Sequence, residues 1–150
     1  MKLDPDCVRD VLLYLESNLE YVERYDCGLE HNEITFSTIT DAILQKHDYS
    51  KDTVNYTIEK LLEVGFITSN KQVRGSNKTI LSAPISDITW NGHQFLNNIR
   101  KQSIWDATKS GAKKIGATSI SALNMIAMEI VKTIVTKPEV INSIMSGLHL

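Results

Sequence analysis

The sequence has few of the residues that mark secreted, metal-binding or membrane proteins. Its 150 residues include two cysteines, Cys7 and Cys27, which do not form the close pair typical of a zinc site or a redox motif. No segment approaches the roughly 18 uncharged apolar residues of a membrane span, and the N-terminus lacks the basic start and apolar run of a signal peptide. We therefore expect a cytoplasmic protein, in a reducing setting, with no membrane partner.

Residues that could carry out catalysis are also sparse. The four histidines lie far apart, with no ligand spacing among them: His31, His47, His93 and His149. No Gly-rich phosphate loop is present. Cys7 falls in the first turn of an expected helix, but three neighbouring aspartates oppose a lowered thiol pKa, so a buried structural cysteine is expected. We expect no enzymatic activity, no metal and no cofactor.

Neither sign of charge is in large excess, but charge is distributed unevenly. The chain is 42% hydrophobic and 23% charged, as in a globular protein, and its net charge is −2. Residues 1–33 carry three basic and nine acidic groups, a net of −6, whereas residues 67–137 carry ten basic and three acidic groups, a net of +7. This pattern fits either a solvated surface with uneven charge or a functional basic patch.

The most informative stretch is YSKDTVNYTIEKLLEVGFI, which runs from Tyr49 to Ile67. Ser50 can cap a helix by accepting hydrogen bonds from its first free amides. One apolar stripe follows at helical spacing, formed by Val54, Ile58, Leu61 and Leu62. Gly65 lies where a left-handed residue commonly ends a helix, and an extended segment begins at Phe66. This order predicts the second half of a winged helix-turn-helix.

The other segments complete that architecture, with helix caps expected at Asp4, Ser37 or Thr38, Thr89 and Ser119 and a helix end at Gly116. The sequence predicts helices at residues 5–19, 39–44, 51–64, 90–101, 104–115, 120–136 and 139–148, a short strand at 34–36, a loop at 20–32 and a hairpin, the wing, at 68–88. The expected fold is mainly α with a small β-hairpin. It comprises a winged-helix domain at residues 1–101 and a helical extension at residues 102–150.

Four segments carry a resemblance to a known family. They read MKLDPDCVRDVLLYLE, YSKDTVNYTIEKLLEVGFI, ITWNGHQFLNNIRKQSIW and GATSIS. Their order and spacing resemble the DUF2513 family of short bacterial and phage proteins, which has no established activity; the resemblance covers most of the chain and concerns the fold. ITWNGHQFL is also similar to the segment that follows the wing in many bacterial winged-helix regulators, with Trp90 and Asn91 in place of the common proline and glutamate.

DNA binding is the first functional hypothesis. The helix at 51–64 would enter a major groove, and the basic wing at 68–88 would contact the backbone. The expected DNA-binding residues are Lys51, Thr53, Asn55, Tyr56, Lys60, Lys71, Arg74 and Lys78. Three carboxylates give residues 51–64 a net charge of −1. The alternative is therefore a helix that serves only the core and exposes a solvated face.

A protein-binding module without nucleic acid is the second hypothesis. In such a phage-encoded inhibitor or adaptor, the acidic segment from Asp4 to Glu33 could mimic nucleic acid or dock on a basic host or phage protein. The helix at 120–136 is more apolar than a surface helix needs to be. Its stripe predicts a homodimer seam through Leu123, Ile126, Ile130 and Ile134, the alternative being an ordinary core.

Overall fold

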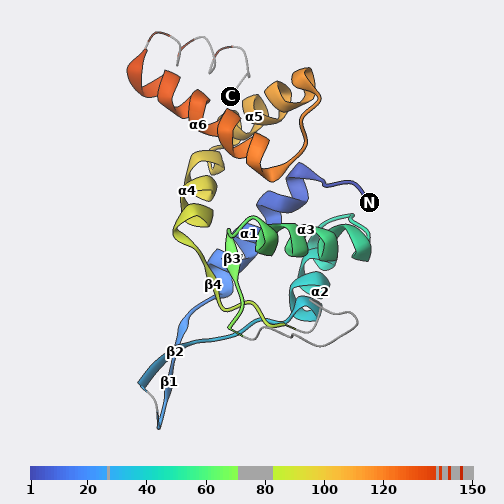
Figure 1. Ribbon diagram of the computed structural model, residues 1–150, viewed down its shortest axis with the longest axis vertical. Helices are drawn as coiled ribbons and strands as arrows, with labels where there is room; N and C mark the ends of the chain where they lie inside the picture. Colours follow the sequence, from blue (N-terminus) through green and yellow to red (C-terminus); the bar gives the residue numbers. More distant parts are fainter. Residues whose placement is uncertain (27, 71–82, 138, 140–141, 143–145, 147–150) are drawn as a thin grey trace. The chain divides into compact units, whose positions relative to one another are not determined.

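Six α-helices and two small antiparallel sheets make up the described part of the chain (Figure 1). This computed structural model describes residues 1–26, 28–70, 83–137, 139, 142 and 146. The chain divides into two compact units, residues 1–93 and residues 94–150. The expected class, mainly α with a small β-hairpin, is confirmed. The predicted domain boundary between residues 101 and 102 stays a prediction.

The first unit contains three complete helices and both sheets. Its helices are α1 (Pro5–Asn18), α2 (Phe36–Lys46) and α3 (Lys51–Glu63), and its strands are β1 (Tyr21–Arg24), β2 (Gly28–His31), β3 (Ile67–Thr68) and β4 (Asp87–Ile88). Each of these helices packs against the other two, while β3 lies against α3 and β4 against α1. The core is aliphatic because each helix buries one apolar stripe: Val8, Val11, Leu12, Leu15, Ile39, Ile43, Val54, Ile58 and Leu61.

Helix α1 begins and ends as the sequence predicts, to within one residue. The Asp4 carboxylate accepts hydrogen bonds from the amides of Asp6, at 2.9 Å, and Cys7, at 3.3 Å. Pro5 occupies the first turn, where its missing amide costs nothing. These two residues fix the helix start because they satisfy or remove the amides that have no partner within the helix.

The predicted loop at residues 20–32 is wrong, because this segment forms the β1–β2 hairpin. Tyr21 pairs with His31 and Arg24 with Gly28, in antiparallel register. Arg24 also forms an ion pair with Glu30, with 3.2 Å between its Nε and the carboxylate. The hairpin was not predicted because most of its side chains are exposed, so it lacks the apolar alternation of a half-buried strand.

Helix α2 begins earlier than predicted. Thr35 is its cap, with a hydroxyl that accepts the amide of Thr38 at 3.2 Å, and the buried Phe36 is its first residue rather than part of a strand. Extended pairing is limited to Ile34, which forms an isolated antiparallel bridge with Ile85. The predicted start at residue 39 is therefore wrong because the cap lies four residues upstream.

The chain leaves α3 through a tight reversal into the second sheet. Gly65 has a φ of +76°, a conformation that costs glycine little, and Phe66 then leads into β3. Ile67 pairs with Ile88 and Thr68 with Asp87. This sheet is the base of the predicted wing, whereas the rest of the wing, residues 71–82, lies outside the described residues.

Helix α4 (Trp90–Ile99) spans the boundary between the units, and its start is held against the second sheet. The predicted cap is confirmed: the Thr89 hydroxyl accepts the Gly92 amide at 3.1 Å and donates to the Gly65 carbonyl at 2.6 Å. A Cβ atom on Gly92 would lie 2.1 Å from the carbonyl oxygen of Phe66. Only glycine therefore allows this close approach.

The second unit is built around two helices that pack together, α5 (Gln102–Ile115) and α6 (Ile120–Thr136). Helix α5 begins two residues before the predicted start and ends at Gly116, as expected. The Ser119 hydroxyl accepts the amide of Ala122 at 3.1 Å, which confirms the predicted cap of α6. Trp105 is fully buried. The predicted helix at 139–148 falls largely outside the described residues.

Candidate nucleic-acid interface

The turn that joins α2 to α3 is held onto α1. The hydroxyl of Tyr49 donates a hydrogen bond of 2.7 Å to the Asp10 carboxylate, and Nδ1 of His47 lies 3.3 Å from the same oxygen. The His47 and Tyr49 rings stack with centroids 5.7 Å apart. Burial, followed by the interaction with Asp10, raises the pKa of Tyr49 well above its usual value. The start of α3 is therefore fixed by a protonated tyrosine bound to a carboxylate.

The first residues of α3 carry the cap that the sequence predicts. The hydroxyl of Ser50 accepts the amide of Thr53 at 3.1 Å and lies 2.8 Å from the Thr53 hydroxyl. Lys51 and Asp52, in the first turn, are both exposed. The helix N-terminus, with its partial positive charge, is thus open to solvent next to a lysine.

The polar side of α3 is only partly free to contact a ligand. Asn55 is half-buried, and its carboxamide oxygen accepts a hydrogen bond of 2.9 Å from the hydroxyl of Thr40 on α2. The Lys60 ammonium lies 5.3 Å from the centre of the Tyr56 ring and pairs with Glu63, which raises the pKa of the lysine. Of the two lysines on α3, Lys60 is therefore already paired within the helix.

The predicted site residues of the wing are not placed by the structure. Lys71, Arg74 and Lys78 lie outside the described residues. The base of the wing is described: the Ser86 hydroxyl donates to the carbonyl of Thr68 at 3.2 Å.

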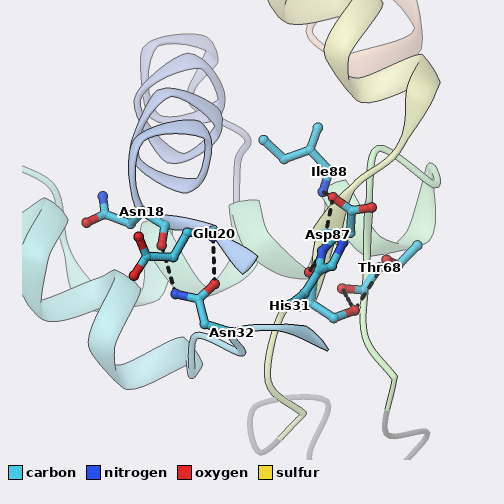
Figure 2. Close-up of polar contacts among 8 residues, drawn as sticks. Asn18, Glu20, His31, Asn32, Thr68, Asp87 and Ile88 are labelled. Carbon is cyan, nitrogen blue, oxygen red and sulfur yellow. Dashed lines mark hydrogen bonds and ion pairs between the residues drawn. The ribbon is translucent and has the colours of Figure 1, made fainter. Parts of the chain in front are cut away.

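The β1–β2 hairpin is tied to α1 and to β4 by side chains for which the sequence predicts no role (Figure 2). Asn32 accepts the Glu20 amide at 2.8 Å and donates to the Asn18 carbonyl at 2.9 Å. His31 Nδ1 lies 3.0 Å from the carbonyl oxygen of Ser86, so this nitrogen is the donor. It also lies 3.8 Å from the Asp87 carboxylate. The pairing of β1 with β2 brings these residues together, and the sequence pattern does not reveal that pairing.

Two open clefts flank His31 and Asp87, which contribute to both. The more aromatic cleft has a volume of about 390 Å³ and is lined by Glu16, Leu19, Glu20, Tyr21, His31, Asp87, Ile88, Trp90 and His93. The other, of about 590 Å³, is lined by Arg24, Glu30, His31, Glu33, Thr68, Asn70, Ser86 and Asp87. Carboxylates outnumber cationic side chains in both clefts, so neither suits a phosphate.

The apolar stripe of α6 is divided between buried and accessible residues. Of the four predicted seam residues, Leu123 is fully buried, while Ile126, Ile130 and Ile134 are half-buried. Ile126 packs close to α5, because a Cβ atom on Gly111 would lie 3.2 Å from its Cγ2. Exposed Met125 borders an apolar hollow of about 390 Å³, which Ile126, Glu129, Ile130 and Thr133 also line.

Cys7 and the possible metal-binding side chains are the remaining candidates for chemistry among the described residues. Burial raises the pKa of the Cys7 thiol to about 11, with smaller opposing and reinforcing effects from Thr57 and two aspartates, and its side chain is fully buried. No group of three histidine, cysteine or acidic side chains in the described ranges could hold a metal ion. No helix within them is long and apolar enough to cross a bilayer.

Comparison with known proteins places the chain in a family. Residues 2–119 match the family model described as "Hypothetical protein (DUF2513)". The chain belongs to the DUF2513 family. The match spans the first unit and α5 and ends immediately before α6. The resemblance predicted from the sequence is thereby confirmed.

A bacterial protein is similar to the chain over most of its length. An uncharacterised protein of Haemophilus influenzae is 26% identical over 113 residues, which are 75% of this chain and 80% of that protein. No solved structure matches the chain. Membership of DUF2513 therefore does not by itself indicate an activity for the chain.

Proposed function

We propose that this DUF2513 protein is a cytoplasmic DNA-binding regulator of the phage or mobile-element type. In this proposal α3 enters the major groove and the wing at residues 68–88 contacts the backbone. The observation that carries it is the α2–turn–α3 unit, in which α3 buries one apolar stripe, exposes Lys51 and Asp52 in its first turn and leaves Thr53, Asn55 and Tyr56 partly exposed. That is the arrangement in which a recognition helix meets base edges.

In this proposal, the side chains near the start and middle of α3 contact the edges of the DNA bases. Thr53, Asn55 and Tyr56 each retain part of their surface. Because the Asn55 carboxamide oxygen already accepts from Thr40, its N–H groups are the part left to donate, for example to the acceptors of guanine. The bond to Thr40 also fixes the orientation of the amide, which reduces the entropy lost on binding.

Affinity has to come mainly from outside α3. Its three carboxylates repel phosphates, and Lys60 is paired with Glu63. Lys51 and the open helix N-terminus can hold one phosphate between them. The wing residues Lys71, Arg74 and Lys78 are therefore assigned most of the phosphate contacts in this proposal.

We also propose that the regulator acts as a homodimer through the accessible stripe of α6. Met125 and Met128 are 68% and 52% exposed, and they lie one helical turn apart. A dimer would give the protein two half-sites on DNA. Since Leu123 is buried within the chain, the seam would use Ile126, Ile130 and Ile134 together with the exposed methionines.

The test is a fluorescence-anisotropy titration with a mixed pool of labelled duplexes. Charge reversal at Lys71, Arg74 and Lys78 should weaken binding to all sequences alike, because phosphate contacts carry no sequence information. Asn55→Ala should instead change the ranking of sequences by about 1–3 kcal/mol at one position. A control with Lys2→Glu and Lys137→Glu, at exposed positions outside α3, the wing and the methionine face of α6, should bind within about twofold of the wild type. Equal effects from all three variants would contradict the proposed roles.

A protein-binding module without nucleic acid is the second candidate. It is favoured by the acidic first 33 residues, with a net charge of −6, and by the carboxylate-lined clefts beside the β1–β2 hairpin. These clefts include Asp87 at the base of the wing, so the protein-binding module is an alternative to the DNA-binding regulator.

A further inference from the structure

The cleft between the end of α1, the β1–β2 hairpin and the start of α4 combines acidic and aromatic side chains. Glu16, Glu20 and Asp87 contribute carboxylates. Trp90 and Tyr21 are large aromatic residues that are 75% and 66% exposed. Exposed aromatic rings beside carboxylates combine the two kinds of group that attract an organic cation.

The walls of this cleft are fixed before any ligand arrives. Asp87 accepts the Ile88 amide at 2.8 Å and faces His31 at 3.8 Å. The Tyr21 ring meets the His31 ring edge-on, with centroids 4.4 Å apart and planes at 82°. The backbone of Glu20 is held by Asn32, as Figure 2 shows. Because these groups are already ordered, binding would cost little conformational entropy.

The chemistry selects a guanidinium group. A guanidinium is planar, stacks on an indole or phenol face and donates two parallel hydrogen bonds to a carboxylate. No three histidine, cysteine or acidic side chains among the described residues are grouped so that they could hold a metal ion. Phosphates would be repelled by the carboxylates of Glu16, Glu20 and Asp87.

The shape of the region favours an extended peptide over a small molecule. The cleft is open rather than enclosed, and it shares His31 and Asp87 with the second cleft, which adds the carboxylates of Glu30 and Glu33. A small ligand is normally buried on most sides, whereas a chain segment can lie across both clefts. The acidic composition of residues 1–33 would attract a basic segment from a distance.

We infer that this cleft binds an arginine side chain from an extended basic segment of a partner protein, with the guanidinium stacked on Trp90 and paired with Glu16, Glu20 or Asp87. This inference goes beyond the DNA-binding proposal and does not depend on it. Trp90, Glu16 and Glu20 lie outside α3 and the wing, whereas Asp87 lies at the base of the wing.

The two tryptophans provide a test with an internal reference, because Trp90 is exposed and Trp105 is fully buried. The probe is an acetylated, amidated peptide of sequence Gly-Arg-Gly-Arg-Gly, titrated into uniformly ¹⁵N-labelled protein. The indole N–H signal of Trp90 should shift and saturate, with a Kd on the order of 0.1–1 mM, while that of Trp105 stays in place. The same peptide with citrulline, which lacks the charge, should cause no saturable shift.

Matched variants separate the cleft from general acidity. Glu16→Gln with Glu20→Gln should weaken binding about fivefold or more. Asp41→Asn with Asp52→Asn removes the same charge from exposed positions elsewhere and should change the Kd by less than about twofold. All four positions are exposed, so folding is preserved. Four results would overturn the inference: no Trp90 shift, equal binding of the citrulline peptide, equal weakening in both double variants, or the same Trp90 shift on adding duplex DNA.

Discussion

At the scale of single residues, Tyr49 links the turn between α2 and α3 to helix α1. Its hydroxyl donates to Asp10, and its ring stacks on His47. The sequence identified Tyr49 only as part of a turn, because nothing local in the chain shows that Asp10 will face it from α1. A partly buried hydrogen bond to a carboxylate stabilises the folded protein more than an exposed one does.

Removing that hydroxyl should destabilise the protein. Tyr49→Phe is expected to lower the free energy of unfolding by about 1–2 kcal/mol, since the hydrogen bond to Asp10 is lost and the ring is kept. Urea unfolding at pH 7 measures this, with Tyr25→Phe as the control because Tyr25 is fully exposed. An unchanged midpoint for Tyr49→Phe would contradict the role of the hydroxyl.

The same variant has a predictable dependence on pH. The pKa of Tyr49 is raised in the folded state, whereas a tyrosine in the unfolded chain has a pKa of about 10. The contribution of Tyr49 is therefore fully present below about pH 10 and is lost as the pH rises towards the folded pKa. The stability difference between wild type and Tyr49→Phe should shrink accordingly above that pH.

At the scale of elements, the sequence predicted those whose signals are local. Caps at Asp4, Ser50, Thr89 and Ser119 all hold as expected, because each depends on a side chain that reaches an amide two or three residues on. The β1–β2 hairpin escaped prediction because its exposed strands are defined by pairing with each other. The same limit hid the clefts, which join residues from α1, the hairpin, β4 and α4.

The contact between α4 and the second sheet gives a prediction for one element. Gly92→Ala should lower the free energy of unfolding by about 3 kcal/mol or more, because the added Cβ would lie 2.1 Å from the backbone oxygen of Phe66. Asn91→Ala, one residue earlier and exposed, should stay within about 0.5 kcal/mol of the wild type. A loss below about 1 kcal/mol for Gly92→Ala in urea unfolding would contradict this packing.

At the scale of the whole molecule, two features of the sequence predict binding partners. These are the uneven charge and the apolar stripe of α6. The structure adds that Lys60 is paired, that Asn55 is anchored to Thr40 and that acidic clefts flank the hairpin. These contacts depend on which side chains face one another across elements. Sequence spacing within one helix cannot supply that information.

The proposed dimer is tested by the molar mass in solution. The chain has a mass of 16.9 kDa, so light scattering across a concentration series should approach twice that value. Met125→Glu with Met128→Glu should shift the mass back to one chain, because it places charges in the apolar seam without touching the buried Leu123. A single-chain mass for the wild type at every concentration would contradict the dimer.

The most direct test of the central claim is the anisotropy titration of wild-type protein against duplex DNA at about 50 mM and about 200 mM salt. If α3 and the wing bind DNA, the affinity should be measurable at the lower concentration. It should fall by about tenfold or more at the higher one, as expected when a few phosphate contacts release counterions. An absence of binding at about 50 mM salt would contradict the DNA-binding account and leave the protein-binding module in its place.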